Sequence, residues 1–81
     1  MTAERVAEAL ASSLGELGIE AETIGPEVRL REDLGLDSME MVQVSLDLTR
    51  RLGVRVRLEA GENGTFREAC EALVRQAGPA R

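Results

Sequence analysis

A glycine-containing turn that leads directly into a helix start is the feature that most restricts how this chain folds. Gly35 is followed at once by Asp37 and Ser38, and apolar residues then recur at helical spacing as far as Leu52. Asp37 and Glu40 form an Asp-x-x-Glu capping pair, which predicts a helix from Ser38 to Leu52 with Asp37 as its N-cap. Because Asp37 caps the helix, we expect the Ser38 hydroxyl to point into solvent.

The start of this helix suits an anion. The first N–H groups of a helix lack internal partners and carry partial positive charge, so an anion such as a phosphate is well placed there, beside the Ser38 hydroxyl. The alternative interpretation is that Ser38 only helps to cap the helix, which is a common role for serine beside aspartate.

Residues 32–44, with the sequence EDLGLDSMEMVQV, resemble the core motif of the acyl carrier proteins. The resemblance implies that Ser38 is esterified by 4′-phosphopantetheine from coenzyme A and that Asp37 is the acidic residue of the motif. It also implies that the thiol of this arm holds acyl or aminoacyl groups as thioesters. Met39 stands where the family more often has leucine, which is a small change of apolar side chain. A carrier of this kind catalyses nothing, so no catalytic residue is expected.

Size and charge exclude several other functions. The 81 residues predict one acyl carrier domain, residues 1–81, with little core to spare. The net charge of −5 argues against nucleic acid as a partner, and no apolar run is long enough to span a membrane. There is no histidine, and Glu32, Asp33 and Asp37 are interpreted as an acidic loop, so no metal site is expected. The single cysteine, Cys70, favours a reducing, cytoplasmic location, and we expect a monomer.

The expected fold class is all-α, an acyl-carrier-protein-like bundle of three main helices plus a short irregular third helix. Apolar spacing predicts the first helix over residues 3–17. A long loop over 18–36, rich in apolar anchors, separates it from the second helix and is expected to contain a short helical turn near 31–34. The short irregular helix is expected at 59–64, and the last helix follows a capping box at Thr65.

The link after the second helix alternates apolar and charged residues. Val54, Val56 and Leu58 are expected to dip into the core, because a single extended segment has no strand with which to pair. Cys70 lies in the apolar stripe of the last helix and is interpreted as a buried structural thiol.

The helix at 38–52 has two apolar faces. One is expected to face the core and contains Met41, Val44, Leu48 and Leu52. Met39, Val42 and Leu46 fall on the opposite face, which is interpreted as a docking stripe beside Ser38. The alternative is that the 18–36 loop covers this second face.

Charge around the stripe departs from the pattern usual in the family, where acidic residues on this helix meet basic patches on partners. Gln43, Thr49 and Arg50 occupy positions that are often acidic, and Arg51, Arg55 and Arg57 add positive charge nearby. The surface is therefore predicted to be acidic at its serine end and basic at its far end. The residues expected to dock partners are Met39, Glu40, Val42, Gln43, Leu46 and Arg50.

The resulting functional hypothesis is a carrier on a phosphopantetheine arm in polyketide or nonribosomal-peptide-like secondary metabolite biosynthesis. Its expected partners are a phosphopantetheinyl transferase, loading enzymes for acyl or aminoacyl groups, and condensing enzymes. The alternatives are a carrier of housekeeping fatty acid synthesis, a D-alanyl carrier, and, in a different class, a helical protein-interaction domain that carries nothing.

Overall fold

The computed structural model describes residues 2–58 and 64–78. Its elements are α1 (Ala3–Glu16), the 3₁₀ turn η1 (Ala21–Thr23), α2 (Ser38–Leu52) and α3 (Phe66–Ala77). The only β pairing in the described part of the chain is an isolated antiparallel bridge between Arg29 and Thr65. The expected all-α class is therefore confirmed. No helix within the described ranges has the length and apolarity needed to cross a bilayer.

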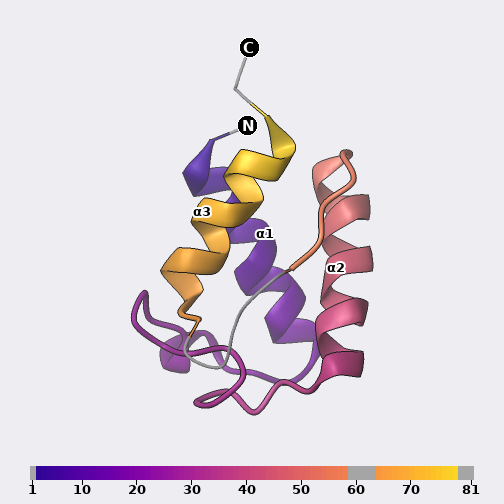
Figure 1. Cartoon of the computed structure of the whole chain (residues 1–81). Coiled ribbons are helices and arrows are strands. Elements are labelled where there is room, and N and C mark those ends of the chain that lie inside the picture. The colour runs from indigo at the N-terminus through magenta and orange to yellow at the C-terminus, as the bar shows by residue number, and fades with distance from the viewer. Residues whose placement is uncertain (1, 59–63, 79–81) are drawn as a thin grey trace.

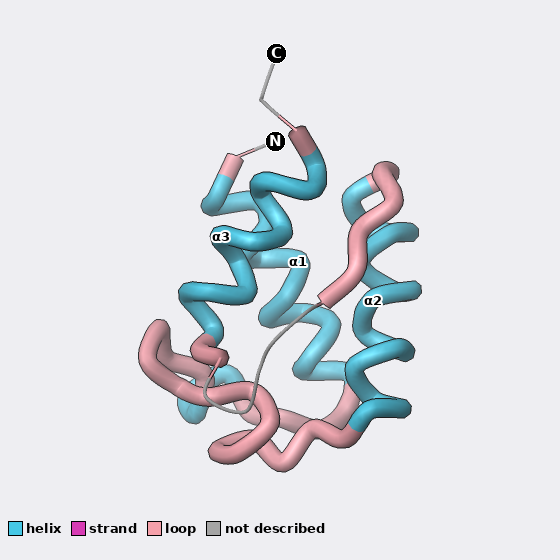
Figure 2. The backbone as a smooth tube through the Cα atoms, viewed as in Figure 1, coloured by secondary structure: helices cyan, strands magenta, loops and turns pink. Residues whose placement is uncertain are grey.

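α2 and α3 both pack against α1 (Figure 1). α1 runs in one direction along the bundle, and α2 and α3 both return in the opposite direction. α1 packs against each of the other two helices, whereas α2 and α3 make few direct contacts. The segment 54–58 descends between α2 and α3 (Figure 2), and its Val56 and Leu58 side chains are buried.

Apolar side chains from every helix and from both connecting segments form one core. The fully buried residues at its centre include Leu10 and Leu14 of α1, Leu48 of α2 and Leu73 of α3. The predicted inner face of α2 is confirmed, because its members lie in this core: Met41, Val44, Leu48 and Leu52.

Local signals set the helix ends. Thr65 caps α3 by accepting a hydrogen bond from Glu68 N, and the Glu68 side chain accepts one from Thr65 N, so the predicted capping box is present. α2 ends at Gly53, whose φ of 75° is the left-handed conformation that glycine adopts without strain. α1 ends at Glu16, one residue before the predicted end.

The long loop crosses one end of the bundle (Figure 2). It is tied to the start of α3 by backbone hydrogen bonds from Leu30 N to Gly64 O at 3.0 Å and from Phe66 N to Val28 O at 2.7 Å. The expected turn near 31–34 is a single hydrogen-bonded turn that begins at Arg29.

For the segment after α2, one expectation is corrected and another falls mostly on residues that the structure does not describe. Val56 and Leu58 are buried as predicted, but Val54 is 36% exposed. Val54 directly follows the left-handed Gly53, so it is still in the turn beyond the end of the core. The short irregular helix is expected at 59–64, and residues 59–63 of this range lie outside the described part of the chain. η1, by contrast, was not anticipated.

Candidate functional site

A complete capping box closes the N-terminus of α2 at the Asp-Ser motif. The Asp37 carboxylate accepts a hydrogen bond from Glu40 N at 2.8 Å, and the Glu40 carboxylate accepts one from Asp37 N at 3.1 Å. Ser38 is the first residue of the helix and is exposed. Within the described residues no hydrogen bond engages its hydroxyl, so the capping work falls on Asp37 and leaves the serine oxygen available for chemistry.

The turn before Ser38 is held by one arginine. The Arg29 guanidinium contacts both Glu32 and Asp33 at 3.1 Å, and Arg29 N donates to the Asp33 carboxylate at 2.9 Å. These hydrogen bonds from Arg29 hold the pKa of Asp33 below its usual value. Leu30 and Leu36 anchor the two ends of the turn in the core. The backbone that leads into Ser38 is therefore fixed from both sides.

The acidic residues near this turn are paired with cations or used as caps. Glu32 and Asp33 bind Arg29, and Asp37 caps α2. In the ranges that the structure describes, no group of three or more metal-ligating side chains is placed to hold an ion. A hollow of about 500 Å³, lined by Arg31, Glu32, Leu36 and Asp37, opens beside the start of α2. It borders Asp37, the residue directly before Ser38.

The second apolar face of α2 is open. Met39, Val42 and Leu46 are 73%, 58% and 69% exposed. The alternative that the long loop covers this face is wrong, because α1 ends and α2 begins at the same end of the bundle, where the loop stays (Figure 1). These residues therefore form an uncovered apolar stripe that begins next to Ser38, with exposed Gln43 beside it.

The charges at the far end of α2 are arranged differently from the sequence expectation in one respect. Arg51 turns toward α1, where it pairs with Glu16, and it also binds Asp47 at 2.6 Å. It is therefore not part of the exposed stripe. The hydrogen bond from Arg51 is the main cause that holds the pKa of Asp47 below its usual value. Arg50 also contacts Asp47, but its side chain is 76% exposed.

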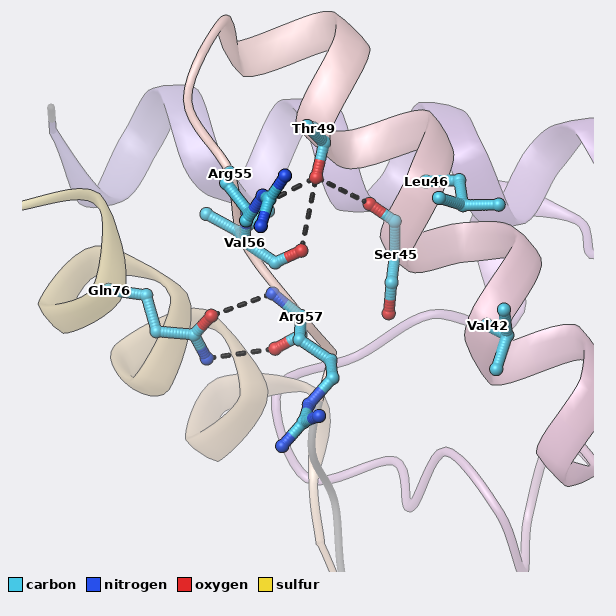
Figure 3. A pocket seen from close by; sticks show the side chains of 8 residues that line it. All are labelled: Val42, Ser45, Leu46, Thr49, Arg55, Val56, Arg57 and Gln76. Carbon is cyan, nitrogen blue, oxygen red and sulfur yellow. Dashed lines mark hydrogen bonds between the residues drawn. The ribbon is translucent and has the colours of Figure 1, made fainter.

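A groove of about 740 Å³ lies beside the stripe, between α2, the 54–58 segment and α3 (Figure 3). Its lining residues are Val42, Ser45, Leu46, Thr49, Arg55, Val56, Arg57 and Gln76. Sequence reasoning did not find this groove. The alternation over 54–58 indicated that the segment packs against the bundle, but nothing local to it indicated against which helices.

Comparison with known proteins identifies the class of the chain. The model of the family described as the phosphopantetheine attachment site matches residues 4–73, a range that contains the Asp37–Ser38 motif. The match covers most of the chain, so the protein belongs to the phosphopantetheine attachment-site family. It is an acyl carrier that bears phosphopantetheine as its cofactor, and its family function is to carry and not to catalyse.

Individual relatives agree with this class. An acyl carrier protein of Saccharopolyspora erythraea is 45% identical over 53 residues, which are 65% of this chain and 53% of that protein. The matched region thus spans about half the length of that relative. An acyl carrier protein of Chlorobium phaeovibrioides is 28% identical over 64 residues, which are 78% of this chain and 82% of that protein. No solved structure matches the chain significantly.

Proposed function

We propose that Ser38 is the residue to which phosphopantetheine is attached. The observation that carries this proposal is the uncommitted hydroxyl of Ser38 at the first position of α2, where Asp37 and Glu40 already form the cap. Attachment therefore removes no hydrogen bond on which the helix start depends. Asp37 keeps the serine at the helix mouth and is the acidic member of the motif.

The surroundings of Ser38 fit a phosphodiester. Helix N-termini favour negative charge through their free N–H groups and the helix dipole. The hollow lined by Arg31, Leu36 and Asp37 borders the residue before Ser38, and Arg31 is an exposed cation that lines it. When bound, the arm supplies a thiol on which an acyl or aminoacyl group is carried as a thioester. The contribution of the chain is to hold that arm on a fixed helix end and to raise the effective concentration of the cargo.

The stripe of Met39, Val42 and Leu46 is proposed as the surface that partner enzymes read. A stripe this short buries little area, so its contacts are weak and allow the carrier to move between partners. Glu40, Gln43 and Arg50 are proposed as its polar rim: Gln43 and Arg50 are exposed, and Glu40 is partly buried by its role in the cap. The partners are a phosphopantetheinyl transferase, loading enzymes and condensing enzymes, and we expect the carrier itself to be monomeric.

The pathway is proposed to be specialised, of the polyketide or nonribosomal-peptide-like kind. Support comes from the exposed Arg50 on the docking helix, where the family more often presents acidic residues. A carrier of housekeeping fatty acid synthesis would be expected to present a uniformly acidic helix to its enzymes.

Intact-protein mass spectrometry tests the attachment. The protein is incubated with coenzyme A, magnesium and a broad-specificity phosphopantetheinyl transferase. We expect one phosphopantetheine increment, which is lost in Ser38→Ala and retained in Ser12→Ala, a matched change at an exposed serine of α1. An increment that persists in Ser38→Ala, or no increment on a protein whose circular dichroism is helical, would contradict the proposal. Loss of a hydroxyl at an exposed first helical position is expected to leave the fold intact.

A further inference from the structure

Two exposed arginines lie near the Leu46 end of the stripe. Arg50 lies four residues after Leu46, so it continues the same exposed face of α2, and its side chain is 76% exposed. Arg55 lies on the 54–58 segment, where it is exposed and lines the same groove as Leu46, with its side chain by Thr49 and Val56 (Figure 3). The surface around this end of the stripe thus carries positive charge from two different elements.

The carboxylate that Arg50 contacts, that of Asp47, is largely shielded from solvent. The Asp47 side chain is only 12% exposed, and it is shared between Arg50 and Arg51. Arg51 in turn binds Glu16 of α1, so the acidic partners in this network lie on the α1 side of α2. In the described part of the chain no carboxylate pairs with Arg55. An approaching protein therefore meets guanidinium groups at this end.

The hydroxyl groups that line the groove are engaged in hydrogen bonds within the protein and are not available to a partner. The Ser45 hydroxyl donates to Met41 O at 2.8 Å and accepts from Leu58 N at 2.7 Å. The Thr49 hydroxyl lies 3.1 Å from both Val56 N and Val56 O. In the described chain no buried side-chain polar atom lacks a partner. The exposed groups on which the docking argument rests are therefore the apolar side chains of the stripe together with Arg50 and Arg55.

The Gln76 side chain also lines the groove, and its polar atoms are hydrogen-bonded within the protein. Its carboxamide oxygen accepts from Arg57 N at 2.7 Å, and its amide nitrogen donates to Arg57 O at 2.8 Å (Figure 3). This pairing attaches the 54–58 segment to α3, while the Thr49–Val56 hydrogen bonds attach it to α2. The backbone that bears Arg55 is therefore fixed relative to α2, which bears Arg50.

We infer that the cognate partner enzyme carries an acidic patch that meets Arg50 and Arg55 while an apolar residue packs on Leu46. This inference rests on the proposed docking role of α2 and adds the charge of the partner to it. Complementary charge at the rim of an interface mainly raises the association rate and rejects partners of the wrong sign. A partner with a basic patch at this position is therefore repelled, and the repulsion weakens as salt screens it.

Charge reversal with a partner of known sign tests the inference. The probe is a malonyltransferase of bacterial fatty acid synthesis, chosen as one with a basic carrier-binding patch, together with a variant in which two basic residues of that patch are replaced by glutamate. The substrates are the phosphopantetheinylated forms of the wild type, Arg50→Glu and Arg55→Glu. Arg75→Glu is the matched control, because Arg75 is exposed on α3 and does not line the groove. Each variant changes the net charge by the same amount.

With the basic transferase, we expect Arg50→Glu and Arg55→Glu each to raise kcat/KM about five- to tenfold, and Arg75→Glu to leave it within about twofold. Loading of the wild type is expected to speed up with added salt. With the charge-reversed transferase the order of the carriers is expected to invert. If Arg50→Glu disturbs the end of α2, the Arg55→Glu variant carries the test alone because it lies outside the helix.

Three results would overturn the inference. The first is that both reversals behave like Arg75→Glu with either transferase, and the second is that they slow the basic transferase. The third is dimerisation of the wild type that Arg55→Glu abolishes, which would identify a second copy as the occupant of this surface. Attachment of the arm is verified by mass before each assay. Failure to attach the arm would therefore count against the proposed function. Full attachment without a charge response would count against the inference alone.

Discussion

The Ser45 hydroxyl accepts a hydrogen bond from Leu58 N at 2.7 Å, and it joins the buried side of α2 to the segment that leads back toward α3. The same hydroxyl donates to Met41 O, so it is satisfied on both sides although Ser45 is buried. This serine is thus one of the side chains that attach the 54–58 segment to α2.

Replacing Ser45 with alanine is expected to destabilise the fold. The change leaves Leu58 N buried without a partner, and an unsatisfied buried donor costs about 1–3 kcal/mol. Urea unfolding followed by circular dichroism measures the loss in the free energy of unfolding. Ser12→Ala, on the exposed side of α1, is the control and is expected to change stability by less than about 0.5 kcal/mol. Equal values for the two variants would show that the Ser45 bridge contributes nothing.

Two leucines of α2 provide a matched test of its two faces. Leu48 is fully buried, whereas Leu46 is 69% exposed. Leu48→Ala is expected to lower the free energy of unfolding by about 2–5 kcal/mol, because it leaves a cavity in the core. Leu46→Ala is expected to lower it by less than about 0.5 kcal/mol. Thermal or urea unfolding of both variants distinguishes the faces, and a large loss for Leu46→Ala would mean that the stripe is covered in solution.

The Asp47 network predicts a pH dependence of stability. Arg51 lowers the pKa of Asp47 in the folded state. The stabilisation is therefore present above the unfolded-state pKa of about 3.9 and is lost as the pH falls through the lower folded-state value. Asp47→Asn is expected to lower stability by about 1 kcal/mol at pH 7. The difference from the wild type should shrink below about pH 4. A difference that is constant from pH 7 to pH 3 would argue against the ion pair as its source.

Cys70 is expected to be unreactive in the native protein. Burial raises the pKa of its thiol to about 11, so the reactive thiolate is scarce at pH 8. Brief treatment with iodoacetamide should leave Cys70 unmodified, whereas the thiol of the attached arm should react. Peptide mass spectrometry locates the label, and a urea-unfolded sample shows that Cys70 reacts once exposed. Rapid labelling of native Cys70 would contradict its place in the core.

Local sequence signals predicted the helices and the start of the site because the interactions that create them are local. The Asp37–Glu40 and Thr65–Glu68 boxes each join residues three positions apart, and both are present. The exposure of Ser38 follows from the first of them. The two faces of α2 follow from periodicity alone, since a helix on one side of a small bundle buries a single stripe.

Features that depend on distant residues were beyond the sequence argument. Arg51 was counted with the surface charges, but its partner Glu16 lies 35 residues earlier on α1. The groove depends on the pairing of Gln76 with Arg57, 19 residues apart. η1 is a single turn without a side-chain cap, so neither hydrophobic periodicity nor a capping motif in the sequence predicts it. Whether Val54 reaches the core depends on where the turn after Gly53 ends. The alternation of apolar and charged residues over 54–58 does not predict that position.

Localising the arm to one hydroxyl tests the central claim most directly. Trypsin releases residues 32–50, a peptide that contains Ser38, Ser45 and Thr49. After reaction with coenzyme A and the transferase, fragmentation of this peptide reports which side chain is modified. The account predicts the phosphopantetheine on Ser38 alone, because Ser45 is buried and both Ser45 and Thr49 are committed to hydrogen bonds. An arm on Ser45, on Thr49 or on a different peptide would contradict it.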